Sequence, residues 1–150
     1  MAIIYKSNSP EETTGIAKDF GRKAAPGDII CLTGPLGAGK TVFAQGFAQG
    51  MGYTGQVTSP TFTVLQVYEG GRLPIYHFDW YRLEGGIAEL EGIGYEDFFF
   101  AEGVTLIEWP EMAAEAVPDG ATQIEIRGGL TGEMRELYVS PQCASSCVNI

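Results

Sequence analysis

The sequence predicts an α/β fold, a mixed sheet with a parallel core and antiparallel strands, flanked by helices. Three observations support this prediction: a glycine-rich segment between a buried strand and a helix, a later apolar strand that ends in an acid, and two pairs of alternating strands. The chain has 150 residues, of which 45% are hydrophobic. We therefore expect one domain over residues 1–150, with a flexible tail over about 141–150.

The glycine-rich segment has the pattern G-x-x-x-x-G-K-T, between a predicted strand at 28–33 and a predicted helix that runs to about Gly50. In that setting it is a P-loop, because glycines let backbone N–H groups point into one concavity and the helix N-terminus adds positive charge. The expected guest is phosphate, so the fold is predicted to be P-loop NTPase-like; a turn without a ligand is the alternative. The residues expected at the nucleotide are Gly34, Pro35, Leu36, Gly37, Ala38, Gly39, Lys40 and Thr41.

Two of these residues carry specific roles in a P-loop. Lys40 supplies a positive charge to the β- and γ-phosphates, and the Thr41 hydroxyl occupies a magnesium coordination position. The sequence therefore predicts a site for a nucleotide and Mg²⁺.

A short strand is predicted at residues 3–5, before a helix. Ser9, Pro10 and Glu12 form a capping box, with an N-cap, a proline at the first helical position and a glutamate at the third. Apolar residues at helical spacing continue to Ala24 and are expected to face the core. The segment 26–28 ends this helix.

Residues 57–63 contain four hydroxyl side chains around Pro60, followed by predicted strands at 64–68 and 73–79 that form an antiparallel hairpin. The hydroxyls can be ordinary turn chemistry. In a nucleotide-binding protein, a loop at this place is also where a switch that senses the γ-phosphate would lie. Ser59 and Thr61 are its candidate residues.

The end of the second hairpin strand concentrates reactive side chains. Alternation along the strand places His77 and Asp79 on one face. Asp79 is a candidate catalytic residue that could orient a water molecule or reach magnesium through water. Pairing with Arg82 is the structural alternative.

Residues 104–108 form an apolar strand that ends in Glu108, a pattern typical of a Walker B strand, whose carboxylate holds magnesium beside the phosphates. Glu108 is therefore a candidate catalytic and metal-binding residue. Short helices are expected at 87–91 and 95–100 before this strand, and a helical stretch at 111–116 after it. Strands at 122–127 and 134–139 are expected to complete the sheet as an antiparallel pair.

The net charge is −10, and the nine Lys and Arg residues are scattered, so strong direct binding of nucleic acid is disfavoured. The N-terminus lacks a signal-peptide apolar run, and no stretch is long enough to cross a bilayer, so we expect a cytoplasmic location without a membrane partner. Cys31 is expected in the core. For Cys143 and Cys147, a metal site or disulfide is the alternative to a plain tail.

The ordered set of motifs resembles the TsaE family, formerly YjeE, the small bacterial ATPases required for threonylcarbamoyladenosine modification of tRNA. The matching segments are GPLGAGKT at 34–41, SPTFT at 59–63, YHFDWYRL at 76–83 and LIEWPE at 106–111. The resemblance covers nearly all of the chain before about Ser140. The tail matches no family motif.

This resemblance implies hydrolysis of ATP, with Mg²⁺, in support of the partner proteins TsaB and TsaD, of which TsaD transfers the threonylcarbamoyl group to tRNA. It implies roles at the phosphates and magnesium for Lys40, Thr41 and Glu108, and a catalytic role for Asp79. It also places Trp109 beside the nucleotide.

Other nucleotide-dependent functions are less well supported by the residues. A GTPase would need an N-K-x-D segment, which the sequence lacks, and a small-molecule kinase usually needs several arginines in a lid, whereas this chain has only five arginines in all. A nucleotide-gated binding module is the alternative from another class. Because the sequence identifies no arginine finger, we expect weak activity without partners.

Overall fold

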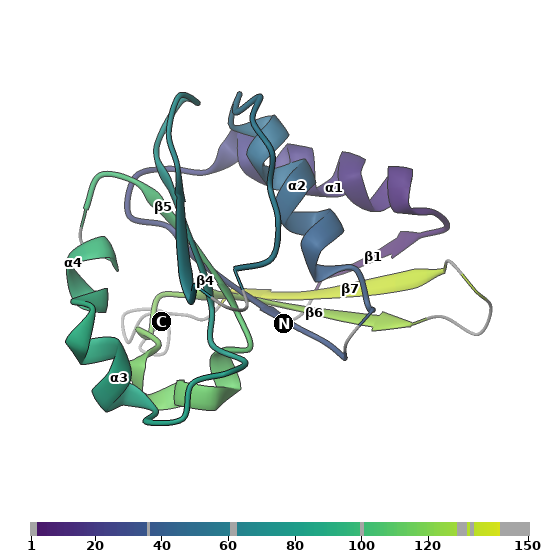
Figure 1. Cartoon of the computed structure of the whole chain (residues 1–150). Helices are drawn as coiled ribbons and strands as arrows, with labels where there is room; N and C mark the ends of the chain where they lie inside the picture. Colours follow the sequence, from purple (N-terminus) through teal and green to yellow (C-terminus); the bar gives the residue numbers. More distant parts are fainter. Residues whose placement is uncertain are drawn as a thin grey trace, which may run out of the picture.

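A mixed sheet of seven strands runs through the part of the chain that the computed structural model describes, residues 3–35, 37–60, 63–99, 101–128, 132 and 134–141 (Figure 1). The spatial order of the strands is β1-β7-β6-β2-β5-β4-β3. The strands are β1 (Ile3–Ser7), β2 (Ile29–Thr33), β3 (Leu65–Tyr68), β4 (Ile75–Asp79), β5 (Val104–Glu108), β6 (Thr122–Gly128) and β7 (Arg135–Pro141). The helices are α1 (Pro10–Lys23), α2 (Lys40–Gly50), α3 (Ile87–Gly92), α4 (Tyr95–Phe99) and the 3₁₀ helix η1 (Pro110–Ala116).

The middle of the sheet is parallel. Strand β2 lies between β5 and β6 and runs parallel to both, and β4 runs parallel to β5 on the other side. Every residue of β5 is buried, which explains its mainly apolar sequence, because a strand covered on both faces has no solvated side. The prediction of a mixed sheet with a parallel core is confirmed.

The edges of the sheet are antiparallel. The predicted hairpin is present, with Leu65 opposite Phe78, and so is the predicted pairing of β6 with β7. Strand β1 pairs with β7 at the far edge, where Ile3 lies opposite Val139. This last pairing joins the two ends of the described chain.

Helices cover both faces of the sheet, and a hydrophobic core lies on each face. Neighbouring residues of strand β2 point into different cores. Leu32 packs in the core under α1 and α2, whereas Cys31 beside it packs with α3, α4 and η1. Figure 1 shows α1 and α2 side by side on one face and α3 and α4 on the other. The expected core position of Cys31 is confirmed, and its burial raises the pKa of the thiol to about 12.

Three glycines allow α1 and α2 to approach closely. A Cβ atom on Gly46 would lie 2.6 Å from the Thr14 carbonyl oxygen, and one on Gly50 would lie 2.2 Å from that of Lys18. In α1, a Cβ on Gly21 would lie 2.2 Å from the Phe47 carbonyl oxygen. The predicted P-loop, residues 34–41, is called the phosphate loop from here on. Because α2 begins at the end of this loop, the packing of α2 on α1 also fixes the direction of the loop.

Several predicted boundaries are corrected. The helix expected at 111–116 is a 3₁₀ helix that begins at Pro110 and has a non-helical residue, Ala113, with φ −150° and ψ 56°. The strand expected from residue 64 begins at Leu65, since Val64 has a φ of 68°. Pro141, expected in the tail, belongs to β7 and pairs with Thr122.

Part of the predicted tail, including Cys143 and Cys147, lies outside the described residues. The capping box is present in part: Ser9 accepts a hydrogen bond from the Glu12 N–H, and the Glu12 side chain accepts one from Asn8. None of the described helices is long and apolar enough to cross a membrane.

Candidate nucleotide site

The phosphate loop connects β2 to α2 through residues with left-handed backbone. Gly34, Gly37 and Gly39 have φ values of 144°, 81° and 109°, a region of backbone conformation that residues other than glycine rarely adopt. Gly34 also lies against β6, where a Cβ atom would come within 2.6 Å of the Ile126 carbonyl oxygen. The loop geometry therefore requires glycine at Gly34 for both reasons. Leu36 lies outside the described residues.

Lys40 begins α2 and turns back over the loop. Its ammonium donates hydrogen bonds to the carbonyl oxygens of Gly34 and Pro35, and it lies 4.0 Å from the centroid of the Trp109 ring. Burial lowers the pKa of Lys40, and the carboxylates of Glu108, Glu111 and Asp79 act in the opposite direction. Lys40 is thus a buried cation whose charge is supported by neighbouring acids.

A cavity of about 650 Å³ opens in front of the phosphate loop. Glu108 and Asp79 both line it because they end neighbouring parallel strands and lie opposite each other in the register. Both are almost fully buried, with 2% of each exposed. The residues around the cavity are Gly37, Gly39, Lys40, Thr41, Val42, Ser59, Asp79, Tyr81, Arg82, Glu108 and Trp109.

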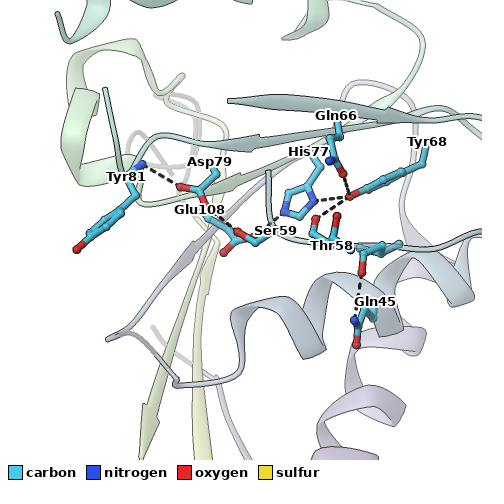
Figure 2. A network of polar contacts seen from close by, with 10 residues as sticks. Gln45, Thr58, Ser59, Gln66, Tyr68, His77, Asp79, Tyr81 and Glu108 are labelled. Atoms are coloured by element: carbon cyan, nitrogen blue, oxygen red, sulfur yellow. Dashed lines mark hydrogen bonds and ion pairs between the residues drawn. The ribbon is translucent and has the colours of Figure 1, made fainter. Parts of the chain in front are cut away.

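The Asp79 carboxylate accepts hydrogen bonds from Ser59 and from the backbone of Tyr81 (Figure 2). The Ser59 hydroxyl donates to Oδ2 at 2.9 Å, and the backbone N–H of Tyr81 donates to Oδ1 at 2.9 Å. Ser59 belongs to the predicted switch-like loop, so this loop contacts one of the two acids directly. The other candidate of that loop, Thr61, lies outside the described residues.

Trp109 follows Glu108 in a left-handed conformation, with φ 58° and ψ 48°. This conformation is uncommon for a bulky residue and carries backbone strain. Its ring lies beside Tyr81, with 4.7 Å between the ring centroids, and over Lys40. Tyr81 and Trp109 thus form an aromatic wall of the cavity.

Sequence reasoning missed Arg135, at the start of β7. Its Nε donates to the Ala38 carbonyl oxygen at 2.9 Å and Nη2 donates to that of Gly37 at 3.4 Å, while Nη1 binds the Gly132 and Met134 carbonyl oxygens. Arg135 therefore holds the outside of the phosphate loop. No sequence signal could identify this contact, because Arg135 follows Ala38 by 97 positions.

The structure brings together most of the predicted site residues. Gly37, Gly39, Lys40, Thr41, Ser59, Asp79, Glu108 and Trp109 line one cavity. Gly34, Pro35 and Ala38 lie in the same loop, where their carbonyl groups bind Lys40 or Arg135. Within the described ranges, no group of three or more His, Cys, Asp or Glu side chains could hold a metal ion.

Comparisons with known proteins identify the family of the chain. The family model described as "Threonylcarbamoyl adenosine biosynthesis protein TsaE" matches residues 7–136. The tRNA threonylcarbamoyladenosine biosynthesis protein TsaE of Bacillus subtilis is 46% identical over 125 residues, which cover 83% of this chain and 77% of the relative. The protein of the same name from Treponema pallidum is 40% identical over 134 residues, 89% of this chain and 97% of the relative.

A solved structure shows the same fold. The crystal structure of Bacillus subtilis YdiB superposes with a TM-score of 0.82 at 36% sequence identity, over 95% of this chain and 87% of that one. The family match at residues 7–136 includes the phosphate loop, the hairpin and strand β5, which bear the cavity residues. The chain belongs to the TsaE family.

Proposed function

We propose that this chain is a magnesium-dependent ATPase that supports threonylcarbamoyl transfer to tRNA by a complex of TsaB and TsaD. Membership of a family named for tRNA threonylcarbamoyladenosine biosynthesis supports the pathway. The observation that carries the ATPase assignment is the single cavity in which Lys40 and Thr41 of the phosphate loop meet the buried acids Asp79 and Glu108.

The phosphate loop supplies the binding of the polyphosphate. Its glycines and the start of α2 offer backbone N–H groups, and Lys40 adds a positive charge beside them. Lys40 is already ordered by the Gly34 and Pro35 carbonyl oxygens, so little side-chain entropy is lost when phosphate binds. Adenine is favoured over guanine because no guanine-reading N-K-x-D segment occurs in the sequence.

The residues around the cavity fit a magnesium ion that arrives with the nucleotide. Two bases, Lys40 and Arg82, and two acids, Asp79 and Glu108, line it, so their formal charges cancel. A polyphosphate placed beside two buried carboxylates would then lack charge compensation. Thr41 and Glu108 would hold the ion, and Mg²⁺ typically uses one or two protein carboxylates together with phosphates. Bound there, Mg²⁺ would neutralise charge that develops on the phosphate oxygens.

Hydrolysis also needs a group that orients the attacking water. Asp79 is suited to this task because Ser59 and the Tyr81 N–H, both neutral donors, fix its carboxylate at the cavity without neutralising its negative charge. A carboxylate held in this way accepts a hydrogen bond from water and places the water oxygen for in-line attack. Glu108 would then serve the metal, and Asp79 the water.

The experiment that tests the proposal is ATP hydrolysis by the purified chain, measured alone and with TsaB and TsaD added, alongside threonylcarbamoylation of tRNA. We expect slow hydrolysis alone and roughly a thousandfold acceleration or more if a partner supplies a positive charge to the site. Equal rates with and without the partners would contradict the role of the complex. Absence of hydrolysis in both mixtures would contradict the ATPase assignment.

A nucleotide-gated binding module is a second candidate, favoured by one contact. The hydrogen bond from Ser59 to Asp79 connects the switch-like loop to the proposed water-orienting acid. A γ-phosphate bound beside Asp79 would therefore change the conformation of this loop, and a partner protein that contacts the loop would respond to the change. Partner affinity measured with ATP, ADP and a non-hydrolysable analogue separates the two functions. Modification of tRNA that is equally fast with the analogue and with ATP would favour gating over hydrolysis.

A further inference from the structure

A chain of polar contacts connects Glu108 to His77 and Tyr68 (Figure 2). His77 Nε2 lies 2.6 Å from Glu108 Oε2, and His77 Nδ1 lies 3.0 Å from the Tyr68 hydroxyl. The three residues come from neighbouring strands, β5, β4 and β3. His77 is fully buried, with 0% exposed, so no water competes for either ring nitrogen.

In the hydrogen bond between His77 and Glu108, the chemistry of the carboxylate decides which group is the donor. An ionised carboxylate only accepts hydrogen bonds, so the hydrogen in this bond is assigned to His77 Nε2. The bond engages Oε2 and not Oε1, and it therefore fixes the rotation of the carboxylate about its last torsion. A carboxylate torsion is otherwise broad, because it joins an sp³ carbon to an sp² carbon.

The second contact extends the chain to the switch-like loop. The Tyr68 hydroxyl lies 3.1 Å from the Thr58 carbonyl oxygen and 2.9 Å from Gln66 Oε1. Burial raises the pKa of Tyr68 to about 12, so the hydroxyl keeps its hydrogen at neutral pH. Next to Thr58, the Val57 carbonyl oxygen accepts a hydrogen bond from Gln45 of α2.

We propose that His77 and Tyr68 are positioning residues that hold the Glu108 carboxylate in the orientation its metal-binding role requires, and that Tyr68 ties this orientation to the loop at Thr58. The inference rests on the proposed function. Hydrogen-bonded partners of metal-binding carboxylates and histidines typically change metal affinity or activity by roughly 10- to 100-fold when removed. A purely structural histidine would stabilise the fold without affecting either quantity.

Two amide substitutions distinguish the two ring nitrogens. In His77→Gln the side-chain amide reaches about as far as Nε2 and can still donate to Glu108, whereas in His77→Asn it reaches only about as far as Nδ1. We expect His77→Asn to lower kcat roughly 10- to 100-fold and to raise the Mg²⁺ concentration needed for half-maximal rate, with little change in KM for ATP. We expect His77→Gln to stay within a few fold of the wild type.

Tyr68→Phe tests the far end of the chain, because it removes only the hydroxyl. We expect a smaller loss of kcat than in His77→Asn, in the same direction. Phe78→Leu is the matched control: Phe78 is also fully buried in β4 but packs in the opposite core, with Trp80 and Phe99. It should lower the melting temperature without changing kcat or the Mg²⁺ requirement.

A second readout does not depend on hydrolysis. Binding of Mn²⁺ to the complex of the protein with ADP, followed by electron paramagnetic resonance, should weaken roughly tenfold or more in His77→Asn and little in His77→Gln. Wild-type kcat and Mn²⁺ affinity in a folded His77→Asn variant would overturn the inference. Equal losses in the Gln and Asn variants would overturn it as well, since only the former keeps the donor.

The failure of the proposed function is distinguishable from that of this inference. If the wild type hydrolyses ATP and His77→Asn is unaffected, only the positioning role is wrong. If the wild type shows no hydrolysis with or without its partners, the ATPase assignment is wrong, and the Mn²⁺ measurement still decides whether His77 orients Glu108.

Discussion

The Lys40 ammonium lies 4.0 Å from the centroid of the Trp109 ring and also donates to the carbonyl oxygens of Gly34 and Pro35. This contact joins the phosphate loop to the residue that follows Glu108. Cation–π contacts of this kind are worth roughly 0.5–2 kcal/mol, depending on how far the cation is desolvated. Lys40 is 6% exposed, so the contact belongs to the desolvated end of that range.

Replacement of Lys40 by alanine should remove nucleotide binding and phosphate chemistry together. The charge acts on the bound nucleotide as well as on the transition state, and a charged hydrogen bond contributes about 1.5–3 kcal/mol. We expect the Kd for ATP with Mg²⁺, measured by titration calorimetry, to rise at least tenfold. Lys23→Ala, at the exposed end of α1, is the control. An unchanged affinity in Lys40→Ala would refute the P-loop assignment.

Glu108→Gln should leave ATP binding measurable and slow hydrolysis. The amide keeps the shape of the side chain but loses the charge proposed to hold the metal, and we expect a fall in kcat of roughly a hundredfold or more. Single-turnover rates at saturating ATP measure it. Asp79→Asn, measured in parallel, tests the other acid. Wild-type turnover in Glu108→Gln together with a loss of turnover in Asp79→Asn would mean that Asp79, and not Glu108, holds the metal.

Arg135→Lys should weaken nucleotide binding although position 135 touches the loop from outside. Lysine keeps the charge but cannot donate to the Ala38 and Gly37 carbonyl oxygens while also binding those of the β6–β7 turn. We expect a rise of roughly tenfold in the Kd for ATP, equivalent to about 1.4 kcal/mol. Arg127→Lys, whose guanidinium pairs with Glu125 at the surface, should change nothing. Equal affinities in the two variants would show that the loop keeps its shape without Arg135.

Gly46→Ala should destabilise the fold, whereas Gly15→Ala should not. Both substitutions lie inside helices and gain up to about 1 kcal/mol in helix propensity. A methyl group at Gly46 meets the Thr14 backbone at 2.6 Å, while one at Gly15 meets nothing within 4 Å. The gain in propensity is common to both variants and overpacking costs about 1–3 kcal/mol, so urea unfolding should separate the two variants by roughly 1–3 kcal/mol, with Gly15→Ala the more stable. Equal free energies of unfolding would mean that α1 can move away from α2 at no cost.

Direct binding of tRNA by the chain alone should be weak at physiological salt. Most of the affinity for nucleic acid comes from Lys and Arg contacts to phosphates. Several of these residues are committed elsewhere: Lys40 to the loop, Arg72 to the carbonyl groups at the end of α1, and Arg135 to the loop from outside.

Lys18, Arg22 and Lys23 along α1 are the candidates for a small basic patch, but Arg22 pairs with Asp19 at 2.8 Å. A mobility-shift assay at physiological salt, with and without ATP, measures the binding. Tight binding by the purified chain without nucleotide would contradict the charge argument.

Local sequence patterns predicted the helices and strands of this fold more reliably than they predicted which strands pair in the sheet. Buried strands, a capping box and a hairpin each depend on residues near one another in the chain, and all were found close to their expected places. The position of β1 was not predictable, because its alternation is too short to indicate which strand it joins. The left-handed Trp109 before η1 and the kink at Ala113 within it are backbone features that no propensity indicates.

The same distinction applies to the site. The meeting of Lys40, Asp79 and Glu108 at one cavity was predictable, because their motifs place them at a loop and at the ends of two strands. His77 was placed on the face of Asp79, but its bond to Glu108 connects residues 31 positions apart and depends on the register of β4 with β5. Arg135 depends on where β7 enters the sheet.

The pairing of β1 with β7 has a consequence for the growing chain. Strand β1 leaves the ribosome before every other described strand, yet its partner residues, 135–139, emerge after nearly everything else that the structure describes. Contacts between such distant segments form late, and unpaired edges recruit other chains in the meantime. Since Arg135 belongs to the same strand, the phosphate loop receives its outer support only when synthesis of β7 is complete.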